Sequence, residues 1–367
     1  MRLVIDGRRL TEERTGVGRC LESLLAEWAQ TGLPLKETLV VLSERSGLAR
    51  VPRAEGLEAR VVQEGSPGLA WECFGLARTL HRDDLLFAPA NLVPPNWRGR
   101  TVLVLYDTLP WVVPQSFPRL VRWRFGWRYR LAAHRADRIL VPSQATADDV
   151  IRIHRIPPER IRVTYPGPEP EFRPLPRHAP EIADARRQVG LEGTTRYFLF
   201  VGKRSGRRNV PAILKAFASH RRAHPEDRLL FVGPDDPGDL PGPAEGTIRA
   251  GHVSEATLRG LLADAIALLY PSDYEGFGLP IVEALASGCP VVTLRNSALT
   301  EAGGDAPWYL DSADAPAMAV ALRILSTNDD ERQQRITRGF AHVTRFSRAR
   351  FASEVKEELI RVATTKR

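Results

Sequence analysis

Two glutamates and a run of glycines lie close together in the second half of the chain. Glu275 is followed by Gly276 and Gly278, and Glu283 comes eight residues after Glu275. Carboxylate oxygens accept hydrogen bonds, and sugar hydroxyl groups donate them. Glycine lets a backbone approach a ligand closely, and the first turn of a helix offers free N–H groups to an anion. This spacing predicts a site for a sugar attached to a diphosphate.

The surrounding residues predict a strand, a loop and a helix. Residues 267–270 form a short apolar run typical of a buried strand, and Pro280 suits the first turn of a helix over residues 280–287. The loop between them would present backbone N–H groups to a diphosphate. The contacts expected from this loop come from Gly276, Phe277, Gly278 and Leu279.

Each glutamate also has an interpretation without a ligand. Glu275 could cap the turn before the helix, and Glu283 could be a carboxylate that complements the helix dipole. The glycines beside Glu275 and the small-residue turn at 287–290 favour the functional interpretation. In that interpretation Glu275 binds the sugar of a nucleotide-diphosphate donor and Glu283 binds its ribose.

Basic residues follow another predicted strand, residues 197–201. Lys203 and Arg208 could neutralise the charge that develops on a leaving diphosphate, or they could belong to a solvated basic loop. The residues alone leave both interpretations open, and the family resemblance described below favours phosphate binding for both. Arg204 and Arg207, in the same loop, are predicted to face solvent.

Short apolar runs alternate with helical patterns along nearly the whole chain, which predicts doubly wound parallel sheets. The strands expected in the first half are residues 3–5, 39–42, 85–87, 102–105, 139–141 and 161–163. Those expected in the second half are residues 197–201, 229–232, 247–250, 267–270, 291–293 and 308–310. The expected helices are residues 18–30, 71–81, 145–154, 210–220, 255–263, 280–287 and 315–325. Six prolines in residues 165–180 predict a linker between two similar halves.

The bulk composition is that of a globular protein with a basic surface. The chain has 367 residues, 43% of them hydrophobic and 26% charged, and its formal net charge is +8 at pH 7. The length favours two domains. The charge favours nucleic acid, anionic lipid or phosphorylated small molecules as partners, or it reflects a solvated Arg-rich surface.

Several further features bear on location and cofactors. The three cysteines form no CxxC pair and fit a reducing compartment. No apolar run approaches the roughly 18 residues of a membrane span, and Arg2 and Asp6 interrupt the N-terminus too early for a signal peptide. The eight histidines lack metal-ligand spacing. We therefore expect a cytoplasmic protein without a metal site.

One basic segment, residues 119–138, contains two tryptophans and further aromatic residues. Its near-alternation over residues 122–131 would allow a strand as well as a helix. Basic residues with interfacial aromatics suit a membrane surface or a phosphorylated lipid acceptor. The alternative is a surface helix with buried tryptophan. The segment therefore allows peripheral contact with the inner face of a membrane, and it equally allows an ordinary surface helix.

The segment EGFGLPIVE, residues 275–283, resembles the E-x7-E signature of the family 4 retaining glycosyltransferases. GKRSGRRNV at residues 202–210 is similar to the basic loop of that family, and TEAGGDAPWYLD at residues 300–311 to its Glu-Gly-Asp stretch. TGVGRC, WECFGLARTL, DLLFAPANLVPP and ADRILVPS also match in the first half. The resemblance covers nearly the whole chain and implies the GT-B fold, with two facing Rossmann-like doubly wound parallel-sheet domains and a cleft between them.

The resemblance implies boundaries for these domains. The acceptor-side domain is expected over residues 1–168, completed by a C-terminal helix at about residues 348–367, where RFSRARFA resembles the helix that crosses back in the family. A Pro-rich linker over residues 169–195 and a nucleotide-sugar donor domain over residues 196–347 are expected to follow.

The resemblance also implies roles for residues outside the central loop. Arg208 aligns with the usual second cation, which is Lys in the family. The loop of Gly16 would cover the donor phosphates, although a lone GxG could be a simple turn. Val253 would place backbone atoms at the base. Glu301 would lie near the donor, with an N-cap-like acceptor as its alternative.

Tyr106 and Asp107 follow the predicted strand 102–105, at a position where many relatives have His-Asp. In those relatives the histidine lies close to the transferred sugar. A phenol can still donate a hydrogen bond. Tyr106 and Asp107 therefore join Glu275 as expected catalytic residues, and the alternative for Asp107 is that it forms a turn.

The predicted function is transfer of a hexose or deoxyhexose, mannose or rhamnose, from a nucleotide-diphosphate sugar to a saccharide or lipid-linked acceptor in cell-surface polysaccharide synthesis. The resemblance implies retention of anomeric configuration and no obligate metal or other cofactor. The alternatives are transfer to a specialised glycoside or natural product, another enzyme of this fold, and a non-catalytic nucleotide-sugar-binding protein. No nucleic-acid-binding module is recognised, so nucleic acid is not an expected partner.

Overall fold

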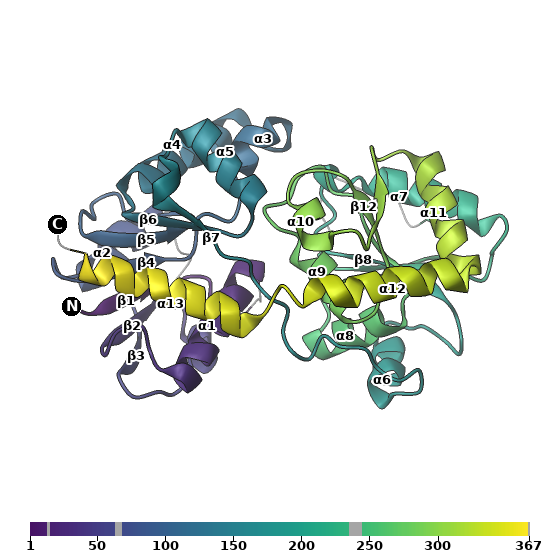
Figure 1. The fold of residues 1–367 in the computed structure, drawn as a ribbon, viewed down its shortest axis with the longest axis horizontal. Coiled ribbons are helices and arrows are strands. Elements are labelled where there is room, and N and C mark those ends of the chain that lie inside the picture. The colour runs from purple at the N-terminus through teal and green to yellow at the C-terminus, as the bar shows by residue number, and fades with distance from the viewer. Residues whose placement is uncertain (13–14, 63–67, 235–243, 366–367) are drawn as a thin grey trace. The chain divides into compact units, whose positions relative to one another are not determined.

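The computed structural model describes residues 1–12, 15–62, 68–234 and 244–365. Within it the chain forms two compact units (Figure 1). The first comprises Met1–Gly167 together with Phe346–Arg367, and the second comprises Pro168–Arg345. The second unit is therefore continuous in sequence, whereas the first is assembled from two separate segments.

The first unit is built on a parallel sheet with the order β3-β2-β1-β4-β5-β6-β7. Its strands are β1 (Leu3–Asp6), β2 (Thr38–Leu42), β3 (Leu57–Val61), β4 (Leu85–Ala88), β5 (Arg100–Val104), β6 (Arg138–Val141) and β7 (Ile161–Val163). Its α-helices are α1 (Gly16–Thr31), α2 (Ala77–Thr79), α3 (Leu109–Val112), α4 (Arg119–Arg135), α5 (Gln144–His154) and α13 (Arg348–Thr364). All strand pairs are parallel, as the short apolar runs predict.

Alternate residues of the central strands face two separate hydrophobic cores. Leu3 and Ile5 join the core formed with α1 and α13, whereas Val4 joins the core that includes Ala132 of α4 and Val150 of α5. Because successive side chains of a strand point to opposite faces, this division places helices on both sides of the sheet. The first unit is thus doubly wound, as expected.

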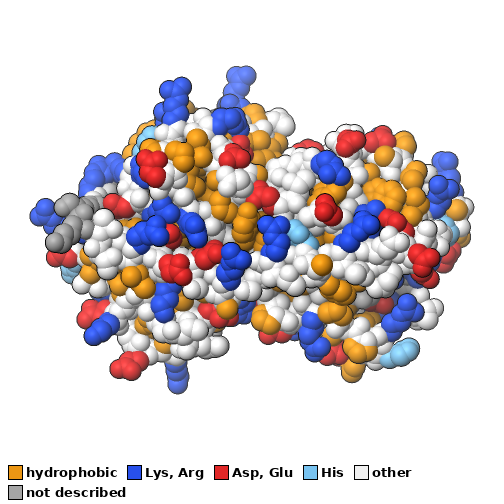
Figure 2. All heavy atoms as spheres, in the orientation of Figure 1, with side chains coloured by type: hydrophobic (Ala, Val, Ile, Leu, Met, Phe, Trp, Pro, Cys, Tyr) orange, Lys and Arg blue, Asp and Glu red, His pale blue; other side chains and the backbone are white. Residues whose placement is uncertain are grey.

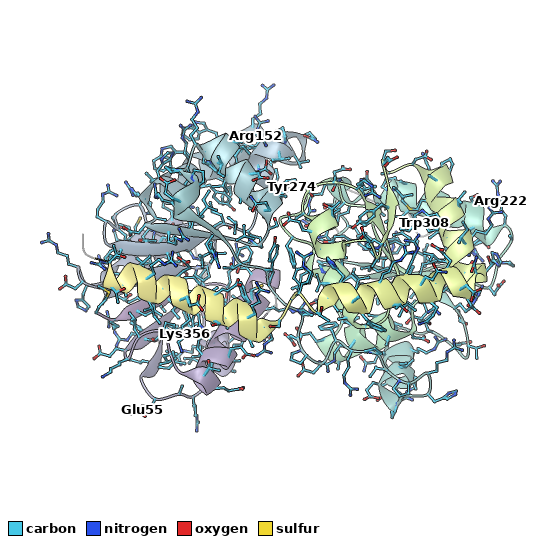
Figure 3. All side chains as sticks on the ribbon, viewed as in Figure 1. Glu55, Arg152, Arg222, Tyr274, Trp308 and Lys356 are labelled. Carbon is cyan, nitrogen blue, oxygen red and sulfur yellow. The ribbon has the colours of Figure 1, made fainter. Side chains whose placement is uncertain are left out.

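Helix α13 packs along α1 and completes the first core (Figure 1). The indole Nε1 of Trp28 in α1 donates to the carbonyl of Ala352 at 2.9 Å. The ammonium group of Lys356, labelled in Figure 3, donates to the carbonyl oxygens of Thr31 and Gly32 at the end of α1. These contacts bring residues about 325 positions apart into one hydrophobic core.

The second unit has a parallel sheet with the order β10-β9-β8-β11-β12-β13. Its strands are β8 (Tyr197–Val201), β9 (Arg228–Val232), β10 (Thr247–Gly251), β11 (Leu268–Tyr270), β12 (Val291–Leu294) and β13 (Trp308–Leu310). Its α-helices are α6 (Pro180–Gln188), α7 (Val210–Arg221), α8 (Glu255–Asp264), α9 (Leu279–Ala286), α10 (Leu299–Gly303), α11 (Ala315–Thr327) and α12 (Asp329–Val343). The chain proceeds outward from β8 to β10 and then resumes at β11 on the other side of β8.

The expected β-α pattern is confirmed, with a few elements that the patterns do not predict. Strand β3 was not expected, because its LEARV sequence mixes charged and apolar residues at an edge. Helix α12 was not expected either, because only Gly339 of its residues is buried. Residues 71–81, expected as one helix, form a π-helix over Trp71–Leu76 followed by α2.

The segment 169–195, expected as a linker, includes α6. Gly260 in α8 lies so close to α6 that an added Cβ would meet the carbonyl oxygen of Glu181 at 2.6 Å. The small residues Gly260 and Ala185 therefore allow α6 and α8 to pack closely, and the helix belongs to the second unit.

The charged side chains visible in Figure 2 are dispersed, with Lys and Arg interspersed among Asp and Glu. The positive formal charge of the chain is not gathered into one patch on this face. Among the described residues, no helix combines the length and the apolar character that crossing a membrane requires.

A matched pair of substitutions in α13 tests its role in the first core. Leu359 is fully buried, whereas its neighbour Ile360 is 37% exposed. Leu359→Ala is expected to lower the free energy of unfolding by about 2–5 kcal/mol, because it removes buried contacts and leaves a cavity. Ile360→Ala is expected to have a much smaller effect. Chemical denaturation of both variants measures the difference, and equal losses would contradict this packing.

Candidate functional site

The candidate site of the second unit lies where the strand order reverses. Strands β8 and β11 are neighbours in the sheet, but the chain leaves them in opposite directions. Loops that follow such a pair of strands diverge and leave room for a ligand at the carboxyl edge of the sheet. The loop after β8 carries Lys203 to Arg208, and the loop after β11 carries Glu275.

Glu275 accepts several hydrogen bonds through its side chain. Its Oε1 accepts hydrogen bonds from Arg207 Nη1 at 2.5 Å, from the Tyr270 hydroxyl at 2.9 Å and from Ser272 Oγ at 3.0 Å. Arg208 Nη2 lies 3.3 Å from the same oxygen. Within the described parts of the chain, every recorded bond to this carboxylate ends on Oε1, so Oε2 is available to a ligand.

The surroundings of Glu275 favour its charged form. Burial alone would raise the pKa of Glu275, but Arg208 and Arg207, with hydrogen bonds from Arg207 and Tyr270, outweigh burial and lower it below its ordinary value. Burial raises the pKa of Tyr270 well above its ordinary value, so the phenol remains a donor. The site therefore holds an ionised carboxylate that can accept a hydrogen bond from a hydroxyl group.

Arg208 lies across the end of β8. Its Nη1 donates to the carbonyl of Val201 at 3.0 Å, and its guanidinium carbon lies 5.0 Å from the centre of the Tyr270 ring. Its Nε is buried without a hydrogen-bond partner. A Cβ at Gly202, whose φ is +121°, would lie only 1.7 Å from Arg208 Nη1. Glycine at position 202 is thus needed for this placement of Arg208.

Three loops at the edge of the sheet are tied to one another. Asn209, in the left-handed conformation at φ 53°, donates through Nδ2 to the carbonyl of Pro271 at 2.9 Å and to Asp273 Oδ1 at 2.7 Å. From the loop after β12, Asn296 Nδ2 donates to the carbonyl of Ser272 at 3.1 Å. These side-chain hydrogen bonds lie beyond the ends of the strands and hold the loop of Glu275 in place.

The loop after β11 leads directly into α9. Gly278 has φ 105° at the N-cap of this helix, and Pro280 lies in its first turn. Among the described residues, the backbone N–H groups of Gly278 and Leu279 have no protein acceptor. Free N–H groups at the positive end of a helix bind anions, so this turn can hold a phosphate group.

The remaining residues expected in this loop are more deeply placed. Gly276 is buried, Phe277 is 5% exposed, and Glu283 in the middle of α9 is 1% exposed. Ser287 Oγ donates to the backbone carbonyl of Glu283 at 2.9 Å. Glu283 is therefore an interior carboxylate one turn beyond the free amides.

Three more expected residues lie on other loops of the second unit. Lys203 is exposed and Val253 is half-buried before the N-cap Ser254 of α8. Glu301 is half-buried in α10, and its carbonyl lies 3.0 Å from His342 Nε2. Val253 follows β10, which is separated from β11 by the two strands β9 and β8. Of these, Lys203 shares its loop with Arg208.

The expected residues of the first unit differ in environment. Gly16 begins α1, and an added Cβ there would meet nothing within 4 Å. Asp107 Oδ1 accepts from the backbone N–H of Leu109 at 3.1 Å, as a turn former does. Tyr106 packs against the first core. Burial raises its pKa well above the ordinary value, with the neighbouring thiol of Cys20 adding to the shift.

The prediction that Arg204 and Arg207 face solvent is wrong. Arg204 is 2% exposed, and its guanidinium carbon lies 5.7 Å from the centre of the Phe231 ring. Arg207 is bonded to Ser272, Tyr274 and Glu275. The short helix Gly206–Arg208 turns Arg207 inward, and no residue spacing in the sequence indicates this turn.

Tyr270 and Ser272 were also not expected at the site. They precede Glu275 by five and three residues, and both donate to its Oε1. In the sequence, both residues carry a hydroxyl group at the end of an otherwise apolar strand. This pattern could have indicated donors for the carboxylate that follows.

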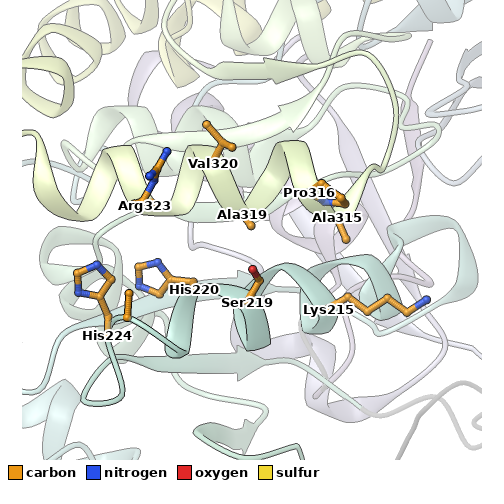
Figure 4. A pocket seen from close by; sticks show the side chains of 10 residues that line it. Lys215, Ser219, His220, His224, Ala315, Pro316, Ala319, Val320 and Arg323 are labelled. Carbon is orange, nitrogen blue, oxygen red and sulfur yellow. The ribbon is translucent and has the colours of Figure 1, made fainter.

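A groove and a polar cluster of the second unit involve none of the residues that bond to Glu275. A groove between α7 and α11 is lined by Lys215, Ser219, His220, Val320 and Arg323, among others (Figure 4). Within the described residues, the one group that could offer three metal ligands is His224, Glu226 and Asp227. Arg196 Nε lies 3.1 Å from Asp227 Oδ1. The arginine already neutralises this carboxylate.

The depressed pKa of Glu275 gives a stability test. On acidification the unfolded chain takes up this proton first, so the stability contributed by ionised Glu275 is lost as the pH falls through its folded pKa, below the ordinary value. Glu275→Gln removes this contribution. The melting temperature of the wild type should exceed that of Glu275→Gln at pH 6, and the gap should narrow below pH of about 4. Glu192→Gln, at an exposed position, is the control, and a gap independent of pH would contradict the ion pairing.

Comparisons with known proteins identify the family of the chain. The family model described as "Glycosyltransferase Family 4" matches residues 15–172, and the one described as "Glycosyl transferases group 1" matches residues 181–342. The O-antigen chain mannosyltransferase B of Escherichia coli is 28% identical, with 72% of this chain and 71% of that protein covered. A D-inositol 3-phosphate glycosyltransferase of Corynebacterium kroppenstedtii is 31% identical, with 62% of this chain and 54% of that protein covered.

Solved structures share the fold over nearly the full length. WaaG, a glycosyltransferase involved in lipopolysaccharide biosynthesis, has a TM-score of 0.75 at 17% identity, with 98% of this chain and 99% of that chain covered. Anabaena Alr3699/HepE in complex with UDP and glucose has a TM-score of 0.73 at 18% identity, with the same coverage. The two family models together match most of the chain, and these structures have its fold, so the chain belongs to the family 4 glycosyltransferases and has the GT-B fold.

Proposed function

We propose that the protein transfers a hexose or deoxyhexose from a nucleotide-diphosphate sugar to a saccharide or lipid-linked acceptor, with retention of anomeric configuration. One observation supports this most strongly. The ionised Glu275 is held by Oε1 beside the free N–H groups at the start of α9. A hydroxyl-bearing ring joined to a diphosphate is the ligand that complements this pair of features.

The proposed mechanism uses the donor itself as the base. The leaving phosphate helps to remove the proton from the acceptor hydroxyl on the same face of the sugar, so no protein nucleophile is needed. Arg208, Lys203 and the backbone of residues 276–280 stabilise the charge that develops on the diphosphate. Glu275 orients the sugar, and Glu283 binds the ribose.

The remaining assignments belong to the same proposal. Val253 contributes backbone atoms at the base, and Glu301 lies near the donor. Gly16 contributes a backbone contact to the phosphates, and Asp107 is a catalytic residue. Tyr106 is proposed as a catalytic residue together with Asp107, and the packing of its half-buried side chain against the first core supports a fixed position for its ring.

We propose mannose or rhamnose as the sugar and a cell-surface polysaccharide as the product, and the names of the relatives support mannose and the polysaccharide. One relative is named an O-antigen chain mannosyltransferase and another an MMP alpha-(1->4)-mannosyltransferase. WaaG is described as involved in lipopolysaccharide biosynthesis. A cytoplasmic enzyme that works at the inner face of a membrane is the setting that we propose.

A donor screen followed by two substitutions tests this function. Purified protein is combined with UDP-, GDP- and dTDP-sugars, and binding is read as a rise in melting temperature. The donor that binds is then used for transfer and for hydrolysis without acceptor. Glu275→Gln and Glu283→Gln should each lower turnover by roughly 100-fold or more while the protein stays folded, because each removes charged hydrogen bonds to the donor.

Two outcomes of these experiments are informative. Near-normal turnover of either variant would contradict the assigned role. Tight donor binding with neither transfer nor hydrolysis would favour a non-catalytic nucleotide-sugar-binding protein.

We propose that protein cations and amides neutralise the diphosphate without a metal, so turnover should be unchanged after treatment with EDTA. A loss of turnover that is reversed by adding Mg²⁺ or Mn²⁺ would contradict the proposed metal-free mechanism.

We also propose that α4 contacts an anionic membrane. Leu120, Trp123 and Trp127 lie at helical spacing and are 73%, 74% and 58% exposed. Arg122 and Arg130 are exposed on the same helix. Exposed tryptophans beside arginines suit the headgroup region of a bilayer, where each basic residue contributes about 1 kcal/mol on an anionic surface.

Vesicle binding tests this contact. The double variant Trp123→Ala, Trp127→Ala should bind vesicles of phosphatidylglycerol and phosphatidylcholine roughly tenfold or more weakly than the wild type, because each indole buries apolar area at the interface. Val320→Ala, which alters an exposed apolar residue of α11, is the control and should bind normally. Binding of the double variant equal to that of the wild type would exclude α4 as the contact.

A further inference from the structure

Arg207 links the loop after β8 to the loop after β11. Its Nη1 lies 2.8 Å from Ser272 Oγ, 2.8 Å from the carbonyl of Tyr274 and 2.5 Å from Glu275 Oε1. Its side chain is only 16% exposed. An exposed ion pair contributes little, but a partly buried guanidinium with several acceptors holds its partner in one geometry.

The backbone of Arg207 is fixed as well. Its carbonyl accepts from the N–H of Asp273 at 2.8 Å and from Asn209 Nδ2 at 3.5 Å. Arg207 therefore contacts the loop of Glu275 through its main chain and through its side chain. Such a residue has little freedom to turn away from the carboxylate when the ligand arrives.

The bonds to Glu275 are unequal on its two oxygens. Arg207, Tyr270 and Ser272 all reach Oε1. Three donors on one oxygen fix the rotation of the carboxylate, and they leave the other oxygen to face a ligand. A carboxylate held in this way loses little conformational freedom when it binds a hydroxyl group.

We propose that Arg207 is a positioning residue for the donor sugar, which holds Glu275 through Oε1 so that Oε2 receives a sugar hydroxyl. This inference rests on the proposed function. Arg207 acts through the carboxylate and touches neither the sugar nor the diphosphate. Arg208, its neighbour, has the different task of neutralising phosphate charge.

This division of roles separates binding of the nucleotide from binding of the sugar. Removal of Arg207 should leave affinity for the free nucleoside diphosphate within about twofold of the wild type. The same change should reduce the extra affinity that the diphosphate sugar has over the free diphosphate. It should also lower kcat, because Glu275 is no longer oriented. The ionised form of Glu275 also loses a cationic partner, so the acid limb of kcat/KM should move to higher pH.

The test compares Arg207→Gln with Arg207→Lys and with the control Arg187→Gln, whose side chain is 74% exposed. Arg207→Gln should lower kcat/KM roughly 10- to 100-fold, the range for a lost charged hydrogen bond. Arg207→Lys should recover part of this loss, and Arg187→Gln should behave as the wild type. In a Glu275→Gln background, adding Arg207→Gln should lower kcat/KM by less than about threefold more, because the partner of Arg207 is already changed.

Several results would overturn the inference. One is an equal loss of affinity for the diphosphate and for the diphosphate sugar in Arg207→Gln. Another is an additive loss in the double variant. Unfolding of both the Gln and the Lys variants would show that the contact serves the fold alone. A wild type that neither transfers nor hydrolyses any donor would instead contradict the proposed function, so the two failures are distinguishable.

Discussion

The ion pair between Arg207 and Glu275 joins the two strands at which the sheet of the second unit reverses its order. At such a reversal the strand ladder does not continue into the diverging loops. Side-chain contacts join these loops in addition to the backbone hydrogen bond from the Asp273 N–H to the Arg207 carbonyl. Arg207, Asn209 and Asn296 supply those connections. The carboxylate, the cation Arg208 and the free amides of α9 depend on this connection for their common location at the edge of the sheet.

The energetic cost of this arrangement is local. Glu275 and two arginines are mostly removed from water, and burial by itself opposes the charge on the carboxylate. The hydrogen bonds to Oε1 offset that penalty. Position 202 must be glycine, because a side chain there would collide with Arg208. A carboxylate held by several donors in this way has one fixed orientation, which is what recognition of a defined sugar hydroxyl requires.

Much of this arrangement could be predicted from the sequence. The β-α alternation predicts both sheets, and the spacing of Glu275 and Glu283 around the glycines predicts the central loop. The direction of individual cations could not be predicted, because four basic residues follow β8 and a single short turn decides which of them face inward. Tyr106 likewise follows a strand as a site residue would, and the half-buried side chain packs against the first core, a contact that the sequence does not indicate.

The split composition of the first unit has a consequence for biosynthesis. Residues 346–365 supply α13, which covers Trp28 and its neighbours, and they are translated after the whole of the second unit. The second unit is continuous and can complete its core while the ribosome is still working. The first unit must wait with an apolar face of its sheet uncovered, so a chain interrupted late in synthesis would expose that face to aggregation or to chaperones.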